Sequence, residues 1–185
     1  MKYYFLMVSL VLASVTEAAA KQWQLQKDHN RLEFSVAIEG SPVSGEFTHL
    51  TADIIFDPEK LDQAHVAVRI DLNHITASYS DVAQNLKKKD WFDVENFPTA
   101  QFIGQDFKHL GGASYQVTGL LTLRDVTRSE VLFFTVTAYE ENRAAITGQM
   151  QINRLNYGVG QGAWRDLSIV AGQVFLDVTV TATGK

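Results

Sequence analysis

Residues 65–72, with the sequence HVAVRIDL, decide the fold class of this chain. Val66, Val68, Ile70 and Leu72 alternate with polar or small residues, so one face of the segment is apolar. A period of two is typical of a half-buried β-strand, above all in antiparallel sheets. The same alternation recurs along most of the chain, which predicts an all-β protein.

Eight or nine strands are predicted from this alternation. They lie at about residues 23–25, 32–38, 45–56, 66–72, 99–102, 115–123, 132–136, 146–152 and 174–180. Antiparallel strands in this number must protect their edges, as a closed barrel or as a sandwich. The alternation barely separates the two, and the length of several strands favours an elongated barrel. A barrel of about eight strands either fills with side chains or holds one small ligand.

One helix is predicted at residues 79–88. Val82 and Leu86 share a face, and residues 87–89 are lysines placed where the helix dipole favours cations. Ser78 is the expected N-cap, and Asp81 lies in the first turn.

Residues 1–20 have the organisation of a cleavable signal peptide. Lys2 supplies a positive charge, residues 3–15 form an uncharged apolar run, and residues 18–20 are three alanines suited to cleavage. The run is shorter than the ~20 residues that cross a bilayer, which argues against an uncleaved anchor. Residues 21–185 are therefore expected to form a single domain with no stable membrane insertion.

The composition excludes several classes of function. A net charge of −5 argues against a nucleic-acid partner, which needs a basic surface. The chain has no cysteine, so disulfides, thiolate metal sites and cysteine nucleophiles are excluded. We find no nucleophile motif and no metal-ligand spacing, and predict no catalytic residue, metal or cofactor. The five histidines are scattered, at positions 29, 49, 65, 74 and 109.

Two stretches resemble functional motifs, but a structural interpretation is favoured for each. The carboxylates of Asp90, Asp93 and Glu95 are expected in a solvated loop paired with the lysines at 87–89, rather than in an acid–base site. Trp91, Phe92 and Phe97 in that loop are expected to pack under the helix or to line a mouth. Residues 158–162 (GVGQG) are expected to connect two strands, since no helix follows to hold a phosphate.

Five blocks of the chain resemble the YceI-like family of polyisoprenoid-binding proteins. The most specific is residues 90–98 (DWFDVENFP), and Asn85, Asp125 and Asn156 depart from the family pattern. The blocks occur in order and span residues 23–36, 43–58, 86–102, 119–128 and 152–160.

The resemblance implies an elongated eight-stranded antiparallel β-barrel, lipocalin-like, with one short helix inserted. It implies an apolar cavity for a long isoprenoid or similar amphiphile, and a periplasmic location. Arg124, Arg154 or Trp164 could contact a head group at the rim. The predicted ligand contacts are apolar residues on the strands: Phe34, Val36, Phe47, Ile54, Phe56, Val68, Ile70, Phe102, Leu121, Leu123, Phe134 and Ile152.

Three functions are therefore weighed. The first is a periplasmic protein that holds a polyisoprenoid-type lipid, such as an isoprenoid quinone or prenyl lipid, for transport, storage or sequestration. The second is a periplasmic enzyme acting on such a lipid, which needs polar groups inside the cavity. The third is a structural or stress-response module whose core is filled, because most apolar stripes are core. The sequence does not give the oligomeric state, and both a monomer and an oligomer are compatible with it.

Overall fold

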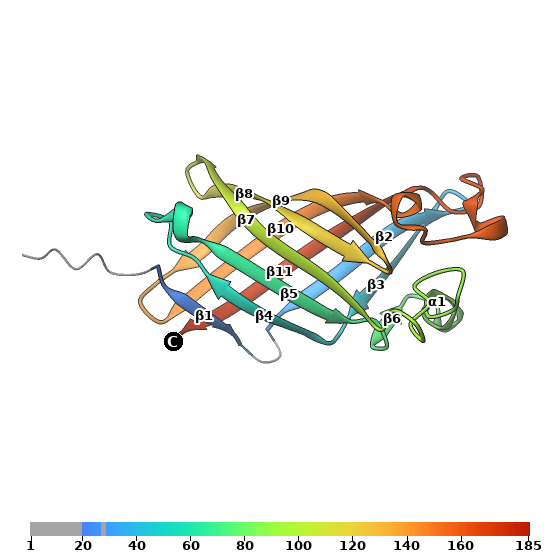
Figure 1. Cartoon of the computed structure of the whole chain (residues 1–185), viewed down its shortest axis with the longest axis horizontal. Helices are drawn as coiled ribbons and strands as arrows, with labels where there is room; N and C mark the ends of the chain where they lie inside the picture. Colours follow the sequence, from blue (N-terminus) through green and yellow to red (C-terminus); the bar gives the residue numbers. More distant parts are fainter. Residues whose placement is uncertain (1–19, 27–28) are drawn as a thin grey trace, which may run out of the picture.

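The computed structural model describes residues 20–26 and 29–185. Within them, eleven strand segments and one short α-helix form an elongated closed barrel (Figure 1). The predicted eight-stranded antiparallel barrel with a single inserted helix is confirmed. The predicted signal peptide, residues 1–20, lies outside the described residues except for Ala20.

Eight strands close the barrel, since β1 pairs with both β4 and β11. Neighbouring strands are antiparallel throughout. In ring order they are β1 (Gln22–Leu25), β4 (Leu50–Ile55), β5 (His65–Asp71), β7 (Thr99–Gly111), β8 (Ser114–Leu123), β9 (Val126–Tyr139), β10 (Arg143–Asn153) and β11 (Gln173–Gly184).

Three further strands lengthen one side of this ring: β2 (Arg31–Ile38), β3 (Ser41–Phe47) and β6 (Ile75–Ala77). β2 pairs with β11 beyond the end of β1, β3 pairs with β2, and β6 pairs with β3. Residues 45–56, predicted as one strand, are thus interrupted at Thr48 and His49. The amide of Thr48 leaves the ladder there and donates to the carbonyl of His74 at 3.0 Å.

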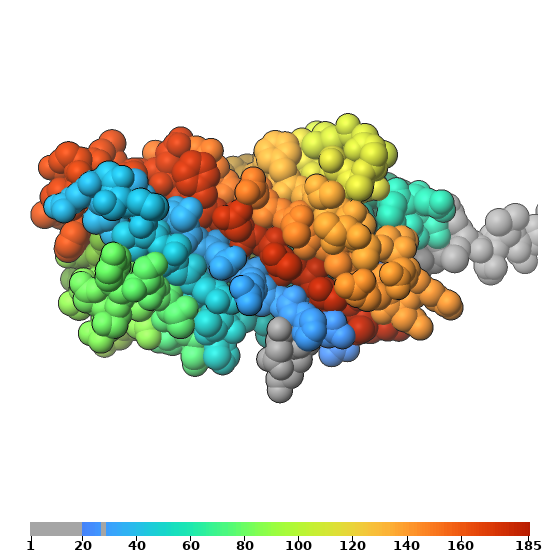
Figure 2. Space-filling view, turned by 180° about the vertical axis from the view of Figure 1, so that it is seen from behind, coloured from blue at the N-terminus to red at the C-terminus, as the bar shows by residue number. Residues whose placement is uncertain are grey.

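The two ends of the barrel differ (Figure 1). The helix α1 (Ser80–Leu86), the loop of residues 87–98 and the short helices η2 (Arg154–Tyr157) and η3 (Gly162–Arg165) gather at one end, called here the helix end. The start of β1, the short helix η1 (Leu61–Gln63) and the C-terminus lie at the other, called the β1 end. Strands β2, β10 and β11 cross the far face diagonally as a closed surface (Figure 2).

The predicted helix is confirmed, but its predicted N-cap is wrong. The N-cap is Tyr79, in an extended conformation and without a side-chain capping bond. The Ser78 hydroxyl donates instead to the carbonyl of Ser44 on β3, at 3.0 Å. The strand pairing of β3 with β6 therefore uses the group that would have capped the helix.

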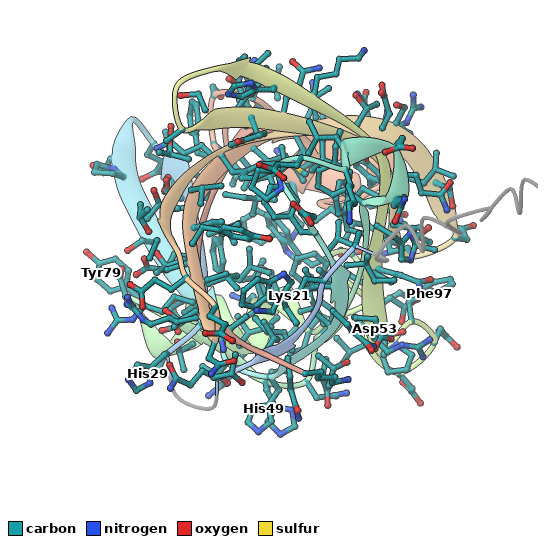
Figure 3. All side chains as sticks on the ribbon, turned by 90° about the vertical axis from the view of Figure 1, so that its left-hand side faces the viewer. Lys21, His29, His49, Asp53, Tyr79 and Phe97 are labelled. Atoms are coloured by element: carbon teal, nitrogen blue, oxygen red, sulfur yellow. The ribbon has the colours of Figure 1, made fainter. Side chains whose placement is uncertain are left out.

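Inward-facing side chains form the core, and a view along the axis shows them inside the ring while the labelled His49 and Tyr79 lie outside it (Figure 3). On β7 and β8 the inner row contains two glycines that are paired, Gly104 and Gly119. A β-carbon on Gly119 would lie 2.5 Å from Cζ of Phe102 and 2.6 Å from the carbonyl oxygen of Ile103. The two glycines therefore leave the space that the Phe102 ring occupies.

We predict that Gly119→Ala destabilises the barrel by about 2 kcal/mol, because the added methyl group overlaps backbone that cannot move without breaking the β7–β8 ladder. Urea unfolding followed by circular dichroism measures the loss. Thr118→Ala on the same strand is the control and should cost less than about 0.5 kcal/mol. Equal stability of the two variants would contradict this account.

The ladder of the barrel wall is incomplete between β9 and β10. These strands pair only through residues 133–139 and 144–149, so residues 126–132 and 150–153 diverge. The helix η2 fills the gap, where the fully buried Tyr157 donates its hydroxyl to Glu130 at 2.6 Å. Nearby, Arg128 donates to the carbonyl of Asn156 at 3.0 Å. Burial, and next the hydrogen bond to Glu130, raise the pKa of Tyr157 well above its ordinary value of 10.0.

This shift predicts alkaline instability. The folded phenol keeps its proton, so the unfolded chain loses protons first and stability falls as the pH rises above about 10. Tyr157→Phe should cost about 1–2 kcal/mol at pH 7 and should weaken this decline, since the ionisable group is gone. Urea midpoints between pH 7 and pH 11 test it. Tyr79→Phe, at a side chain that is 61% exposed, is the control. Parallel pH curves for Tyr157→Phe and wild type would refute the role of Tyr157.

Candidate ligand cavity

Two cavities lie end to end inside the barrel. The helix-end cavity, of about 250 Å³, lies between the strands and the segments that gather around α1. The β1-end cavity, of about 170 Å³, is lined by Trp23 and Phe56 among other residues. Four side chains line both cavities and form a waist between them: Leu32, Ile70, Leu121 and Leu176.

All twelve predicted contact residues lie in these walls. Ile70 and Leu121 belong to the waist. The helix-end cavity takes Phe34, Val36, Phe47, Leu123 and Ile152. The β1-end cavity takes Ile54, Phe56, Val68, Phe102 and Phe134. Period-two alternation thus identified the lining strands, and contact with a ligand stays a prediction for each residue.

The helix-end cavity also has a wall that the alternation did not mark. Val82, Asn85 and Leu86 reach it from α1, and Val159 and Val170 reach it from the segment between β10 and β11. Helical spacing places Val82 and Leu86 on one face of α1, but the segment between β10 and β11 has no period that says which of its side chains face inward. Of the three aromatic residues expected to pack under the helix or to line a mouth, Trp91 and Phe92 line this cavity and Phe97 lines neither cavity.

The two cavities differ in polarity. Side chains that line the β1-end cavity are apolar except for Arg31, which lies at its edge and is itself exposed. The helix-end cavity is lined by the exposed Asp81 and the half-buried Asn85 from α1, and by the buried Arg154. A long amphiphile would therefore find polar groups at the helix end.

Arg154 holds the helix end together. It is 2% exposed, and no carboxylate of the described residues pairs with it. Its guanidinium donates all five of its N–H groups to backbone carbonyls. The acceptors are Ala171 at 2.8 Å, Val159 at 2.9 Å, Gly160 at 3.4 Å, and Trp164 and Val170 at 2.7 Å each. Burial lowers the pKa of this guanidinium. Since no N–H remains, Arg154 fixes the segment after β10 and has no donor left for a head group.

Arg124 fixes the other half of the helix end. Its guanidinium donates to the carbonyls of Lys89 and Trp91, lies 3.8 Å from the carboxylate of Asp93, and covers the ring of Phe97. Asp93 is buried, so the expectation that it is solvated and paired with the lysines is wrong. Asp90 and Glu95 are exposed, as expected, but no ion pair of the described residues joins them to the lysines at 87–89.

One polar group near the cavity has no partner. Nε1 of Trp91 is the only buried side-chain nitrogen or oxygen of the described residues without a hydrogen bond. Trp23, in the β1-end cavity, donates its own Nε1 to the carbonyl of Phe56 at 2.8 Å. An unpaired buried donor costs about 1–3 kcal/mol. The folded protein bears this cost at the helix-end cavity.

We predict that Arg154→Lys destabilises the protein by about 3 kcal/mol, although it keeps the charge. A lysine has three N–H donors on one atom and cannot reach five carbonyls that surround a planar group. Chemical unfolding measures the loss. Arg165→Lys, at an exposed residue of η3, is the matched control and should be neutral. An unchanged midpoint for Arg154→Lys would show that the carbonyls are satisfied otherwise.

The closed barrel, its two apolar cavities and the loops and short helices that cover its helix end define a lipocalin-like binding barrel. Residues 23–182 match the YceI-like domain, and the chain belongs to that family. Among the described residues, no helix is long and apolar enough to cross a membrane, and no group of three or more acidic or histidine side chains could hold a metal ion.

Relatives and solved structures agree with this assignment. A UPF0312 protein of Shewanella denitrificans is 25% identical over 178 residues, which cover 93% of this chain and 91% of that protein. BcnA of Burkholderia cenocepacia is 28% identical, with a TM-score of 0.81 over 86% of this chain and 99% of BcnA. A polyisoprenoid binding domain from Saccharophagus degradans shares the fold at 13% identity, with a TM-score of 0.70 over 90% of this chain and 99% of that domain.

Proposed function

We propose that this protein is an exported, periplasmic carrier that holds a polyisoprenoid or similar long-chain amphiphile inside the barrel. This proposal rests on the pair of apolar cavities that meet at a common waist. Small-molecule sites usually measure about 300–1,000 Å³. Neither cavity alone reaches that size, whereas the two together do. Membership of the YceI-like family and the fold shared with a polyisoprenoid binding domain support the same ligand class.

The energetics suit an apolar chain. Each buried methylene is worth about 0.8 kcal/mol, so ten carbons contribute about 8 kcal/mol before the cost of ordering the chain. The strands supply this environment without a catalytic group. The unfilled space argues against a module whose core is simply packed, and the comparisons favour a binding protein over an enzyme. In the proposed role the barrel carries, stores or sequesters a lipid that cannot cross an aqueous compartment unaided.

The direct test is to extract protein purified from its periplasm with organic solvent and to identify lipids by mass spectrometry. We expect a prenyl lipid or isoprenoid quinone in the extract. Delipidated protein should take up the same lipid in vitro. Absence of lipid in the extract, together with no uptake of a quinone or prenyl lipid, would contradict the proposal.

The waist gives a sharper prediction. Leu121 is buried and lines both cavities, so Leu121→Phe should narrow the passage between them. We expect the variant to bind a long polyprenol at least about tenfold more weakly and to keep its affinity for a short one that needs a single cavity. Dissociation constants for farnesol and a long polyprenol measure this. Leu120→Phe, on the outer face of the same strand, is the control. Equal losses for both chain lengths would mean that the two cavities are not used in series.

A further inference from the structure

The geometry points to a head-group site at the helix end, in which the indole N–H of Trp91 donates to a neutral oxygen, a hydroxyl or carbonyl, at the head of the ligand. This inference rests on the proposed function. It adds the direction in which the ligand lies and the chemical class of its head. The apolar tail would cross the waist and occupy the β1-end cavity.

The unpaired N–H of Trp91 is the first observation. Trp91 is 9% exposed, lines the helix-end cavity and packs against Trp164, another lining residue, with ring centroids 5.5 Å apart. The guanidinium carbon of Arg154 lies 5.5 Å from its ring centroid. Buried polar groups are almost always hydrogen-bonded, and an exception calls for an acceptor that the protein does not supply. A ligand oxygen beside Trp91 would be such an acceptor.

The unequal polarity of the cavities is the second observation. Asp81 and Asn85 line only the helix-end cavity. In the β1-end cavity the indole N–H of Trp23 is already used by the carbonyl of Phe56. Apart from the exposed Arg31, no polar side chain of the described residues lines that cavity, so a polar head buried inside it would lose its hydrogen bonds to water without replacement. The head is therefore favoured at the helix end and the tail at the β1 end.

The available donors decide the class of head. A phosphate needs several donors at once, usually from arginine or lysine. The N–H groups of Arg154 are all engaged with carbonyls, and the one carboxylate in the described part of the chain that lines this cavity, the exposed Asp81, would repel a phosphate. A hydroxyl or carbonyl needs only one donor, and Trp91 offers one. The site therefore fits a prenyl alcohol or quinone better than a prenyl phosphate.

The test combines a protein change with a ligand change. Trp91→Phe keeps an aromatic ring and removes the N–H. Delipidated wild type, Trp91→Phe and Trp164→Phe are titrated with geranylgeraniol, with geranylgeranyl phosphate and with the hydrocarbon of the same chain, by displacement of a fluorescent lipid. We expect Trp91→Phe to weaken the binding of geranylgeraniol about tenfold and to leave the affinity for the hydrocarbon unchanged. Trp164→Phe should change the affinities for geranylgeraniol and for the hydrocarbon equally. Wild type should bind the alcohol more tightly than the phosphate.

Two further measurements separate a binding role of Trp91 from a packing role. The indole N–H resonance of Trp91 should move downfield when geranylgeraniol binds and should not move with the hydrocarbon. The melting temperature of ligand-free Trp91→Phe should equal or exceed that of wild type, because the unpaired donor is gone.

The outcomes are distinguishable. If wild type binds none of the ligands, the proposed function fails together with the head-group site. If wild type binds the alcohol and hydrocarbon but Trp91→Phe weakens both equally or neither, the carrier role stands and the head-group site is refuted. Tighter binding of the phosphate than of the alcohol would also refute the assigned class of head.

Discussion

Closure of the barrel depends on the four residues of β1. This strand pairs with β11 through Trp23, Gln24 and Leu25 and with β4 through Gln22 and Trp23, so it covers two edges that would otherwise be free to pair with other chains. The predicted cleavage after Ala20 leaves β1 whole, together with the carbonyl of Lys21 that accepts a hydrogen bond from the amide of Phe56. Once the ring is closed, every second side chain points into the interior, and in this barrel those side chains leave two cavities unfilled.

The unfilled interior needs one end that is capped, and two arginines build that cap. Arg124 and Arg154 both donate to backbone carbonyls of loops that have no regular structure of their own. Loops of this kind carry unpaired carbonyls, which are costly when buried. A guanidinium satisfies several of them with one side chain and leaves the cavity wall apolar. The helix end is therefore held together by guanidinium groups whose N–H donors are bonded to backbone carbonyls and not to a ligand.

The alternation predicted the strands and the side chains that line the cavities, whereas the choice of a barrel over a sandwich rested on strand length and on the resemblance to the YceI-like family. In residues 65–72 and the other strands, a period of two says which side chains face inward, and closure turns each inner face into a cavity wall. The end of the barrel follows no such rule. The burial of Asp93 depends on Arg124, which follows β7 and β8 in the chain, and the loss of the Ser78 cap depends on Ser44 of β3. Contacts between segments so distant in the chain leave no local pattern.

The same contrast underlies the direction proposed for the ligand. Strand walls are uniform, since alternation places Val, Ile, Leu and Phe inward along the whole length of the barrel, and a uniform tunnel would accept a chain either way round. Only the cap, built from α1 and irregular loops, brings Asp81, Asn85 and the unpaired Trp91 to one end. In the proposed function, the strands would select a long apolar cargo, and the loops of the helix end would select which of its ends is recognised. Changes in the loops could alter the head that is bound without disturbing the barrel that holds the tail.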